Sequence, residues 1–192
     1  MSEQELDYKT RQKRRLRPAL LLLMIGGGLA LLLLILVPTL QTSRHGPGYS
    51  RLRCASNLRQ IGTAFALYAT ENGGALAPDF ATLLQTQDLA SDLFVCSSTD
   101  DDRSTATQPS MLRADLVHGS GHCSYVFVGG AGKLSEMTGD DVLAYEPLAN
   151  HQNDRTNVVF ADGQVAFVTE KLAKIIVDQH TEGVRPVRLK GR

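Results

Sequence analysis

The spacing of hydrophobic residues changes along the chain, and each spacing predicts a different element. An uninterrupted apolar run covers Ala19–Val37 without a charged or strongly polar side chain, and about 20 such residues form a helix that crosses a bilayer core. A cleaved signal peptide is the alternative, but its apolar region has about 7–15 residues and ends in small residues of the A-x-A type. We therefore expect a transmembrane helix over residues 19–40, retained as a signal anchor.

Basic residues flank this run unevenly, and their distribution predicts its orientation. The richer side of a span stays in the cytoplasm, so residues 1–18 are expected to be a cytoplasmic basic segment. Residues 41–50 form a linker in which Gly46-Pro47-Gly48 cannot continue a helix, and the rest of the chain is extracytoplasmic. The expected location is the cytoplasmic (inner) membrane, crossed once with the N-terminus inside. The basic residues before the run are Lys9, Arg11, Lys13, Arg14, Arg15 and Arg17.

Beyond the linker, apolar residues recur at helical spacing. Between Arg51 and Gly74 they fall at alternating steps of four and three residues, which places them on one face of an α-helix. Asn72-Gly73-Gly74 is a typical helix stop, because glycine adopts the left-handed conformation needed there. Asp79 can cap a second, short helix. The apolar face, which we expect to cover a sheet, consists of Cys54, Leu58, Ile61, Phe65 and Tyr68.

The second half of the chain has the pattern of strands. The polar segment Ser97–Ser110 is expected to be a long surface loop, and its three aspartates lack the spaced ligands and turn glycine of a calcium loop. Runs rich in valine and aromatic residues follow at Cys123–Gly129 and Asp141–Pro147, and both are typical of strands. A helix followed by an antiparallel sheet predicts an α+β domain over residues 51–180, with a basic tail over residues 181–192.

The stretch "HQNDRTNVVFADGQV", His151–Val165, reads as a β-hairpin. Asp162-Gly163 fits a two-residue type I′ turn, in which both central residues have positive φ. In that register Phe160 pairs with Val165, and we expect the face that carries these bulky side chains to pack under the long helix.

Composition excludes some functions and leaves others open. The chain has 20 lysines and arginines against 20 aspartates and glutamates, so no basic excess indicates nucleic-acid binding. Three cysteines would allow one disulfide in an oxidising compartment, between one pair among Cys54, Cys96 and Cys123. The alternative is that each cysteine is a small buried apolar residue.

Candidate ligand-binding residues gather around the histidine of the hairpin stretch: Glu146, His151, Asp154 and Asp162. His151 and Asp162 lie at opposite ends of one strand, roughly 25–30 Å apart at about 3.3 Å per residue, so they cannot meet along a straight strand. Glu146 and His151 flank one turn and could bind each other or one ion. In the alternative, Asp162 serves its turn, His151 bonds the loop backbone and Glu146 is a solvated strand end. We expect no enzyme, no catalytic residue, no cofactor and no small-molecule substrate; whether a metal binds stays open.

The segments "CASNLRQIGTAFALYATENGG", "FVCSS", "SYVFVG", "VLAYEP" and "NHQNDRTNVVFADGQV" resemble the prepilin-like bacterial proteins that carry a C-terminal His-(about nine residues)-Asp-Gly domain. The signature maps to His151, Asp162 and Gly163, with ten residues between His151 and Asp162 and with Gln164 where the family usually has histidine. The prepilin leader motif is not found before the apolar run. The resemblance implies a pilin-like fold, in which one long amphipathic helix packs on a small antiparallel sheet.

Two functions follow as predictions. The first is a membrane-anchored pilin-like or pseudopilin-like structural or interaction protein, with the membrane and other pilin-like or type II secretion proteins as its partners. The alternative is an extracytoplasmic ligand-binding or metal-binding domain, with or without enzymatic activity, that uses Glu146 and His151.

Overall fold

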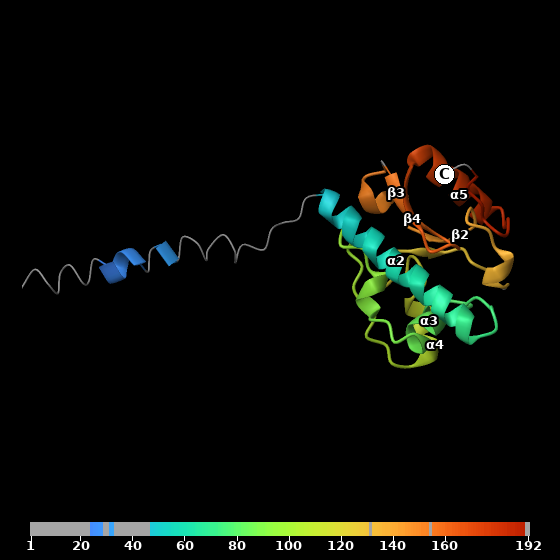
Figure 1. Cartoon of the computed structure of the whole chain (residues 1–192), viewed down its shortest axis with the longest axis horizontal. Helices are drawn as coiled ribbons and strands as arrows, with labels where there is room; N and C mark the ends of the chain where they lie inside the picture. The colour runs from blue at the N-terminus through green and yellow to red at the C-terminus, as the bar shows by residue number, and fades with distance from the viewer. Residues whose placement is uncertain (1–23, 29–30, 33–46, 131, 154, 191–192) are drawn as a thin grey trace, which may run out of the picture. The chain divides into compact units, whose positions relative to one another are not determined.

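The structure is a computed structural model that describes residues 24–28, 31–32, 47–130, 132–153 and 155–190. The chain divides into two units, Met1–Arg44 and His45–Arg192. The second unit carries all the labelled helices and strands of Figure 1, from α2 to α5. It is an α+β domain with one four-stranded antiparallel sheet, and every site discussed below lies in it.

The predicted transmembrane helix over residues 19–40 is contradicted. None of the helices in the described part of the chain is long and apolar enough to cross a membrane. Within the predicted span only residues 24–28 and 31–32 are described, and they are helical and exposed; the others lie outside the described residues. The longest described helix, α2, carries Arg53 and Arg59 on its exposed face. The anchor and the inner-membrane location that rested on the span are therefore corrected with it.

The long amphipathic helix is present as α2, Pro47–Glu71. It begins inside the predicted linker, because proline is well tolerated in the first turn, where its missing N–H would have no partner. Cys54, Leu58, Ile61 and Phe65 are fully buried on one face. The helix ends where predicted: Gly73 and Gly74 have φ of 64° and 89°, and the Gly74 N–H donates to the Ala69 carbonyl at 2.7 Å.

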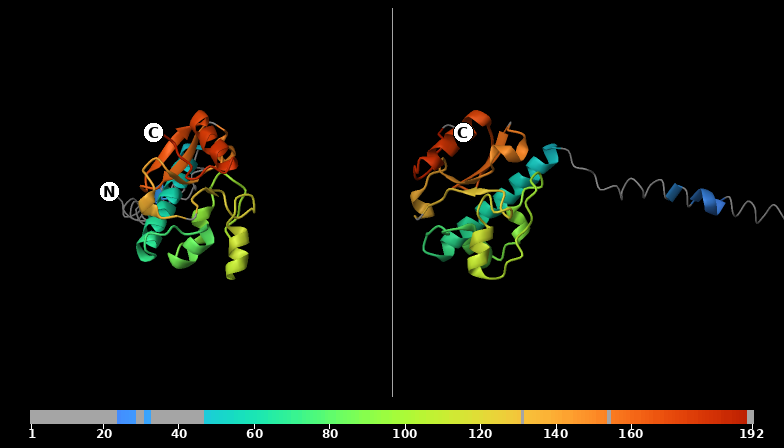
Figure 2. Two further views of the ribbon diagram at one scale, coloured as in Figure 1. Left: turned by 90° about the vertical axis from the view of Figure 1, so that its right-hand side faces the viewer. Right: turned by 180° about the vertical axis from the view of Figure 1, so that it is seen from behind.

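Three helical pieces and a loop connect α2 to the sheet, and a fourth, η2, lies between β1 and β2. Asp79 caps α3 as expected, since its Oδ1 accepts a hydrogen bond from the Thr82 N–H at 2.6 Å. The helix α4 follows the polar loop and lies beside α3, on the side of the domain away from α5 (Figures 1 and 2). The elements are α3 (Phe80–Thr86), the 3₁₀ turn η1 (Ser91–Phe94), α4 (Pro109–Asp115) and, within the sheet region, η2 (Leu134–Glu136).

The sheet is a simple antiparallel meander in the order β1-β2-β3-β4. Both of its faces are covered, so it separates two apolar cores. Val159 packs with α2, α3 and η1 on one face, whereas Val158 and Phe160 pack with the closing helix on the other. The elements are β1 (Val126–Phe127), β2 (Val142–Tyr145), η3 (Leu148–His151), β3 (Arg155–Phe160), β4 (Val165–Thr169) and α5 (Glu170–Thr181).

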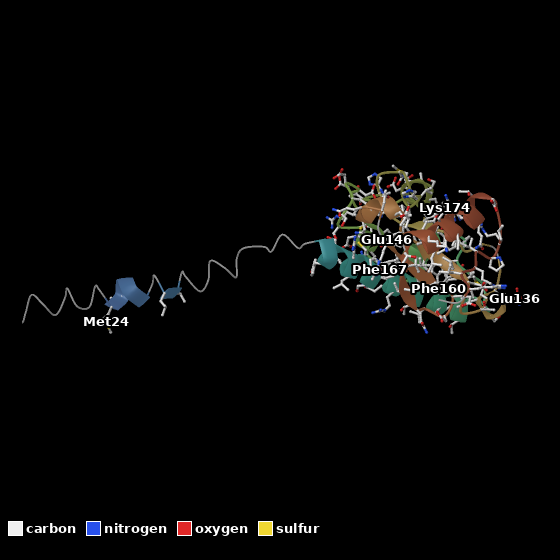
Figure 3. The ribbon with its side chains drawn as sticks, turned by 90° about the horizontal axis from the view of Figure 1, so that it is seen from above. Met24, Glu136, Glu146, Phe160, Phe167 and Lys174 are labelled. Atoms are coloured by element: carbon white, nitrogen blue, oxygen red, sulfur yellow. The ribbon has the colours of Figure 1, made fainter. Side chains whose placement is uncertain are left out.

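The hairpin register differs from the prediction by one residue. Val159, not Phe160, pairs with Val165. The Phe160 carbonyl accepts from the Gly163 N–H at 2.9 Å, and only Gly163 of the turn has positive φ, at 80°. This is a three-residue loop with a glycine bulge rather than a type I′ turn. The face that packs under α2 is therefore the one with Val159 and Val165, and Phe160 faces α5 (labelled in Figure 3).

The basic tail is part of the fold rather than a frayed end. Val187 and Leu189 are buried, and the Val187 carbonyl accepts from the Val142 N–H at 2.8 Å. Arg188 Nε donates to the buried Asp141 carboxylate at 2.6 Å. These contacts give the sheet an additional edge segment over part of the range 181–192.

Candidate metal centre

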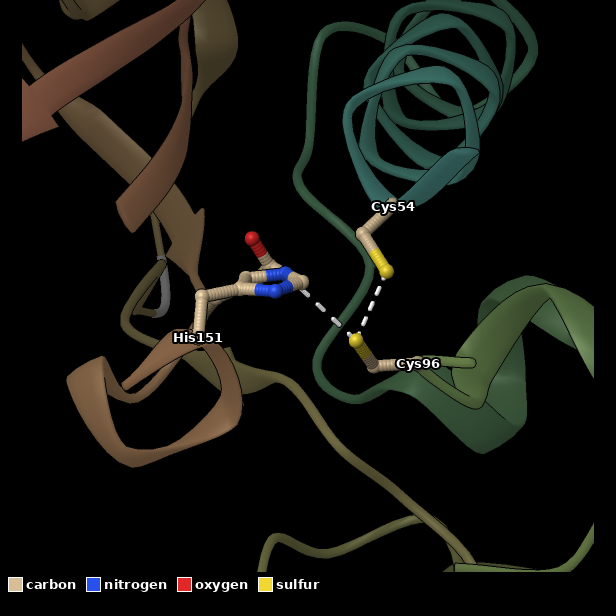
Figure 4. A group of neighbouring side chains, drawn as sticks. Cys54, Cys96 and His151 are labelled. Carbon is tan, nitrogen blue, oxygen red and sulfur yellow. Dashed lines mark hydrogen bonds and ion pairs between the residues drawn. The ribbon is translucent and has the colours of Figure 1, made fainter. Parts of the chain in front are cut away.

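Four buried side chains from four separate segments converge between α2 and the sheet. They are Cys54 of α2, Cys96 after η1, Glu146 after β2 and His151 at the end of η3. Their ligand atoms all lie within 4.8 Å of one another, and in the described ranges no other group of three or more histidine, cysteine or acidic residues does so. Figure 4 shows the His151 ring facing the two sulfur atoms. We call this group the Cys-Cys-Glu-His cluster.

Local structure explains how each member reaches the cluster. Cys54 opens the buried stripe of α2, one turn before Leu58. Cys96 is held by a hydrogen bond from its backbone N–H to the Ser124 hydroxyl at 2.9 Å. Side chains alternate across a strand, and Glu146 follows Tyr145, which faces α5. Glu146 therefore faces α2.

His151 is turned toward this same space by an unusual loop. It ends η3, and the next residue, Gln152, has a left-handed conformation with φ of 62°. The Arg51 guanidinium donates to the His151 carbonyl at 3.2 Å. The chain reversal and this contact bring the histidine back over the end of the strand that carries Glu146.

The distances within the cluster are those of potential ligands in contact. His151 Nε2 lies 3.1 Å from Glu146 Oε1 and 3.6 Å from Cys96 Sγ, and the Sγ atoms of Cys54 and Cys96 are 2.7 Å apart. Metal–ligand bonds of a tetrahedral zinc site imply about 3.4 Å for the N···O edge, about 3.6 Å for the S···N edge and about 3.8 Å for the S···S edge. Two of the three measured edges fit closely, and the sulfur atoms are about 1 Å too close.

An outer residue fixes the carboxylate of Glu146. Asn157 Nδ2 donates to Glu146 Oε2 at 2.6 Å, and the Asn157 backbone N–H reaches the same oxygen at 3.3 Å. The second oxygen, Oε1, is thereby directed to His151. Such second partners orient metal ligands and tune their basicity, so Asn157 is the expected positioning residue of the cluster.

The cluster shifts the pKa of its own members. The hydrogen bond to Glu146 raises the pKa of His151, although burial opposes it. The hydrogen bond shared with Cys96 lowers the pKa of Cys54 against the effect of burial, and the same bond together with burial raises the pKa of Cys96. One thiol is thus set to ionise before the other, close to a carboxylate. A cation bound at this point would offset the negative charge that accumulates when both thiols ionise.

The predicted ligand residues are only partly brought together. Glu146 and His151 lie in contact, and Glu146 is fully buried rather than a solvated strand end. Asp162 is exposed in the hairpin turn, where its Oδ1 accepts from the Gln164 N–H at 3.0 Å, and it is not a member of the cluster. Asp154 lies outside the described residues. The signature residue Gly163 serves the turn through its positive φ.

Sequence reasoning did not connect the two cysteines with the histidine. Cys54 could have been noticed as the first residue of the buried stripe, but no local signal places Cys96 beside it. The third cysteine, Cys123, is elsewhere: its Sγ bonds the Tyr125 carbonyl at 3.3 Å, and burial raises its pKa to about 12. Cys123 belongs to no group of three or more histidine, cysteine or acidic residues within the described part of the chain.

A small pocket of about 200 Å³ adjoins the cluster and has His151 in its wall. Ser98, two residues beyond Cys96, lines it on one side, and Arg51, three residues before Cys54, lines it on another. The pocket gives water-sized molecules a place next to the buried His151 side chain.

Comparisons with known protein families, with curated proteins and with solved structures found no match to this chain. The resemblance to prepilin-like proteins therefore stays a prediction, and the site is interpreted from its own chemistry.

Proposed function

We propose that this domain binds one thiol-preferring divalent cation, with zinc as the first candidate, through the Cys-Cys-Glu-His cluster. The observation that carries the proposal is the convergence of four ligand atoms within 4.8 Å, from four segments far apart in sequence. Thiolate and imidazole ligands favour zinc over magnesium and calcium, which take oxygen ligands.

The ion has a structural role in this proposal. Zinc sites that act in catalysis keep one position for water or substrate, whereas structural sites are closed by four protein ligands. Cys54, Cys96, Glu146 and His151 supply four, and all are buried. The ion would join α2, the segment after η1 and the end of the sheet, which supports a non-enzymatic function.

The test is metal binding by the full chain, reduced and stripped of metal. Equilibrium dialysis should give one zinc ion per chain, and Co²⁺ should give the visible bands of a tetrahedral site together with thiolate charge transfer. Zinc at 100 times its dissociation constant should stabilise the fold by about 2.7 kcal/mol. Cys54→Ser and His151→Ala should lose this stabilisation.

Matched controls separate the cluster from the rest of the chain. Cys123→Ser removes a buried cysteine that lies outside the cluster, and Asp162→Asn changes the signature aspartate in the turn. Both variants should bind zinc as the wild type does. Equal binding by wild type and Cys54→Ser, or loss of binding in Cys123→Ser, would contradict the proposal.

A second candidate is the pilin-like structural or interaction role. The observation that favours it is the outer face of α2, where Leu52 and Leu67 are 73% and 53% exposed and lie about 60° apart around the helix at 3.6 residues per turn. A second copy of the chain is the occupant to test. Sedimentation of the full chain should show self-association that weakens in Leu52→Ser and Leu67→Ser; a monomer at all concentrations would exclude this candidate.

A further inference from the structure

The two cysteines of the cluster have a second chemistry open to them. Their Sγ atoms are 2.7 Å apart, which lies between about 2.05 Å for a disulfide and about 3.8 Å for two thiolates on one tetrahedral zinc ion. The same pair is therefore within a small displacement of either arrangement. One pair of sulfur atoms cannot adopt both at once.

We propose that Cys54 and Cys96 are a peroxide-sensitive oxidation site, at which disulfide formation expels the bound cation. This inference rests on the proposed function and adds its regulation. After the cross-link forms, only Glu146 and His151 remain as ligands, 3.1 Å apart and bonded to each other. Two protein ligands are fewer than the three or four of known zinc sites, so oxidation and metal binding exclude each other.

The chemistry balances with hydrogen peroxide as the oxidant. The sulfur of one cysteine attacks a peroxide oxygen, the O–O bond breaks, and the sulfur becomes a sulfenic acid. The sulfur of the second cysteine then attacks that sulfur, the S–O bond breaks and the S–S bond forms. In the zinc-loaded site both cysteines are thiolates, so solvent supplies two protons: two thiolates, one peroxide and two protons give one disulfide and two waters, and Zn²⁺ is released.

The nearest pocket to the two sulfur atoms reaches the cluster at His151, and neither cysteine lines it. Cys54 and Cys96 are fully buried, and the adjoining pocket of about 200 Å³ is lined by Arg51, Ser98 and His151. A molecule of the size of peroxide fits in this pocket beside His151, whose Nε2 lies 3.6 Å from Cys96 Sγ. Cys123 does not compete, because its Sγ bonds the Tyr125 carbonyl outside the cluster.

The experiment uses the full chain loaded with zinc and treated with hydrogen peroxide. A chromogenic chelator follows zinc release, and alkylation of the unfolded chain followed by peptide mass mapping identifies the oxidised residues. We expect one zinc ion released for each Cys54–Cys96 cross-link formed, with Cys123 still alkylated. Reduction with dithiothreitol should restore zinc binding. Cys123→Ser should respond as the wild type does, and Cys96→Ser should form no cross-link.

The outcomes separate this inference from the proposed function. If the reduced chain binds zinc but peroxide yields no cross-link, or yields one with zinc retained, the inference is overturned and the proposed function stands. If the reduced chain binds no zinc, both are overturned, and a mapped Cys54–Cys96 bond would then be a structural cross-link.

Discussion

The contact between α2 and β3 positions Cys54, and a single methyl group should disturb it. Gly62 lies on the buried side of α2, two turns beyond Cys54. A Cβ atom added there would come within 2.7 Å of Val159 Cγ2, whereas apolar carbon atoms pack at about 3.5–4.0 Å. Val159 is fully buried and β-branched, so its rotamer is restricted. Gly62→Ala should therefore push α2 away from the sheet.

The magnitude follows from two opposing effects. Replacing glycine by alanine inside a helix stabilises it by about 1 kcal/mol, and overpacking a core costs about 1–3 kcal/mol. The net effect of Gly62→Ala should be a loss of up to about 2 kcal/mol in the free energy of unfolding. Gly48→Ala is the matched control on the same helix, because its added Cβ meets nothing within 4 Å. It should be neutral or slightly stabilising.

Urea unfolding of the metal-free, reduced chain, followed by far-ultraviolet circular dichroism, measures these differences as shifts in midpoint at constant slope. The variant Val159→Ala removes the clashing carbon, so in that background Gly62→Ala should no longer destabilise. Zinc affinity should fall in Gly62→Ala, because Cys54 moves with the helix. If Gly62→Ala raises stability as Gly48→Ala does, the close packing of α2 on β3 is wrong.

Three further predictions concern the cluster, the tail and the turn. Asn157→Ala should weaken zinc affinity about 10–100-fold, because the Glu146 carboxylate loses the amide that orients it; unchanged affinity in a zinc titration would show that Asn157 only packs. Arg188→Met should destabilise the fold at neutral pH, because it leaves the Asp141 carboxylate without its cation. Burial by itself raises the pKa of Asp141, but the hydrogen bonds from Arg188 and the Thr138 backbone outweigh it and lower that pKa. The ionised Asp141 therefore stabilises the fold above its unfolded pKa of 3.8, and this stabilisation is lost as pH falls through the lower folded pKa. The acid side of the melting-temperature profile should accordingly be flatter in Arg188→Met, and a profile parallel to that of the wild type would count against the pair. Gly163→Val should destabilise by about 1–3 kcal/mol, because a β-branched residue is strained at positive φ, with zinc affinity unchanged in the variant that still folds.

The elements that depend on neighbours in sequence could be predicted from the sequence. The four-three spacing from Cys54 to Phe65 placed the buried face of α2 correctly, and Asn72-Gly73-Gly74 marked its end. Asp79 as an N-cap needs only the amide three residues ahead, and it forms that bond. The buried helix face, the helix end and the N-cap each depend on residues within one or two helical turns, so they can be predicted from a short stretch of sequence.

The hairpin register could not be predicted from such local patterns, and the transmembrane prediction was wrong. Asp162-Gly163 fits two turns equally well by composition, and a one-residue slip exchanges the faces of every strand residue. Packing in the two cores determines the register, because Val159 packs against α2 and Phe160 packs against α5. The transmembrane helix over residues 19–40 was inferred from hydropathy alone, and the described helices do not include one.

The cluster shows the same division most clearly. Glu146 and His151 are five residues apart and flank one turn, so the sequence alone indicated that they could meet. Cys96 is 42 residues from Cys54 and 55 residues from His151, and no periodicity extends over such distances. Only the packing of α2 and the η1 segment against the end of the sheet brings these sulfur atoms to the histidine. The physical reason is that contacts between distant segments depend on how the whole domain packs, whereas helix caps, helix ends and the buried face of a helix depend on residues nearby in the sequence.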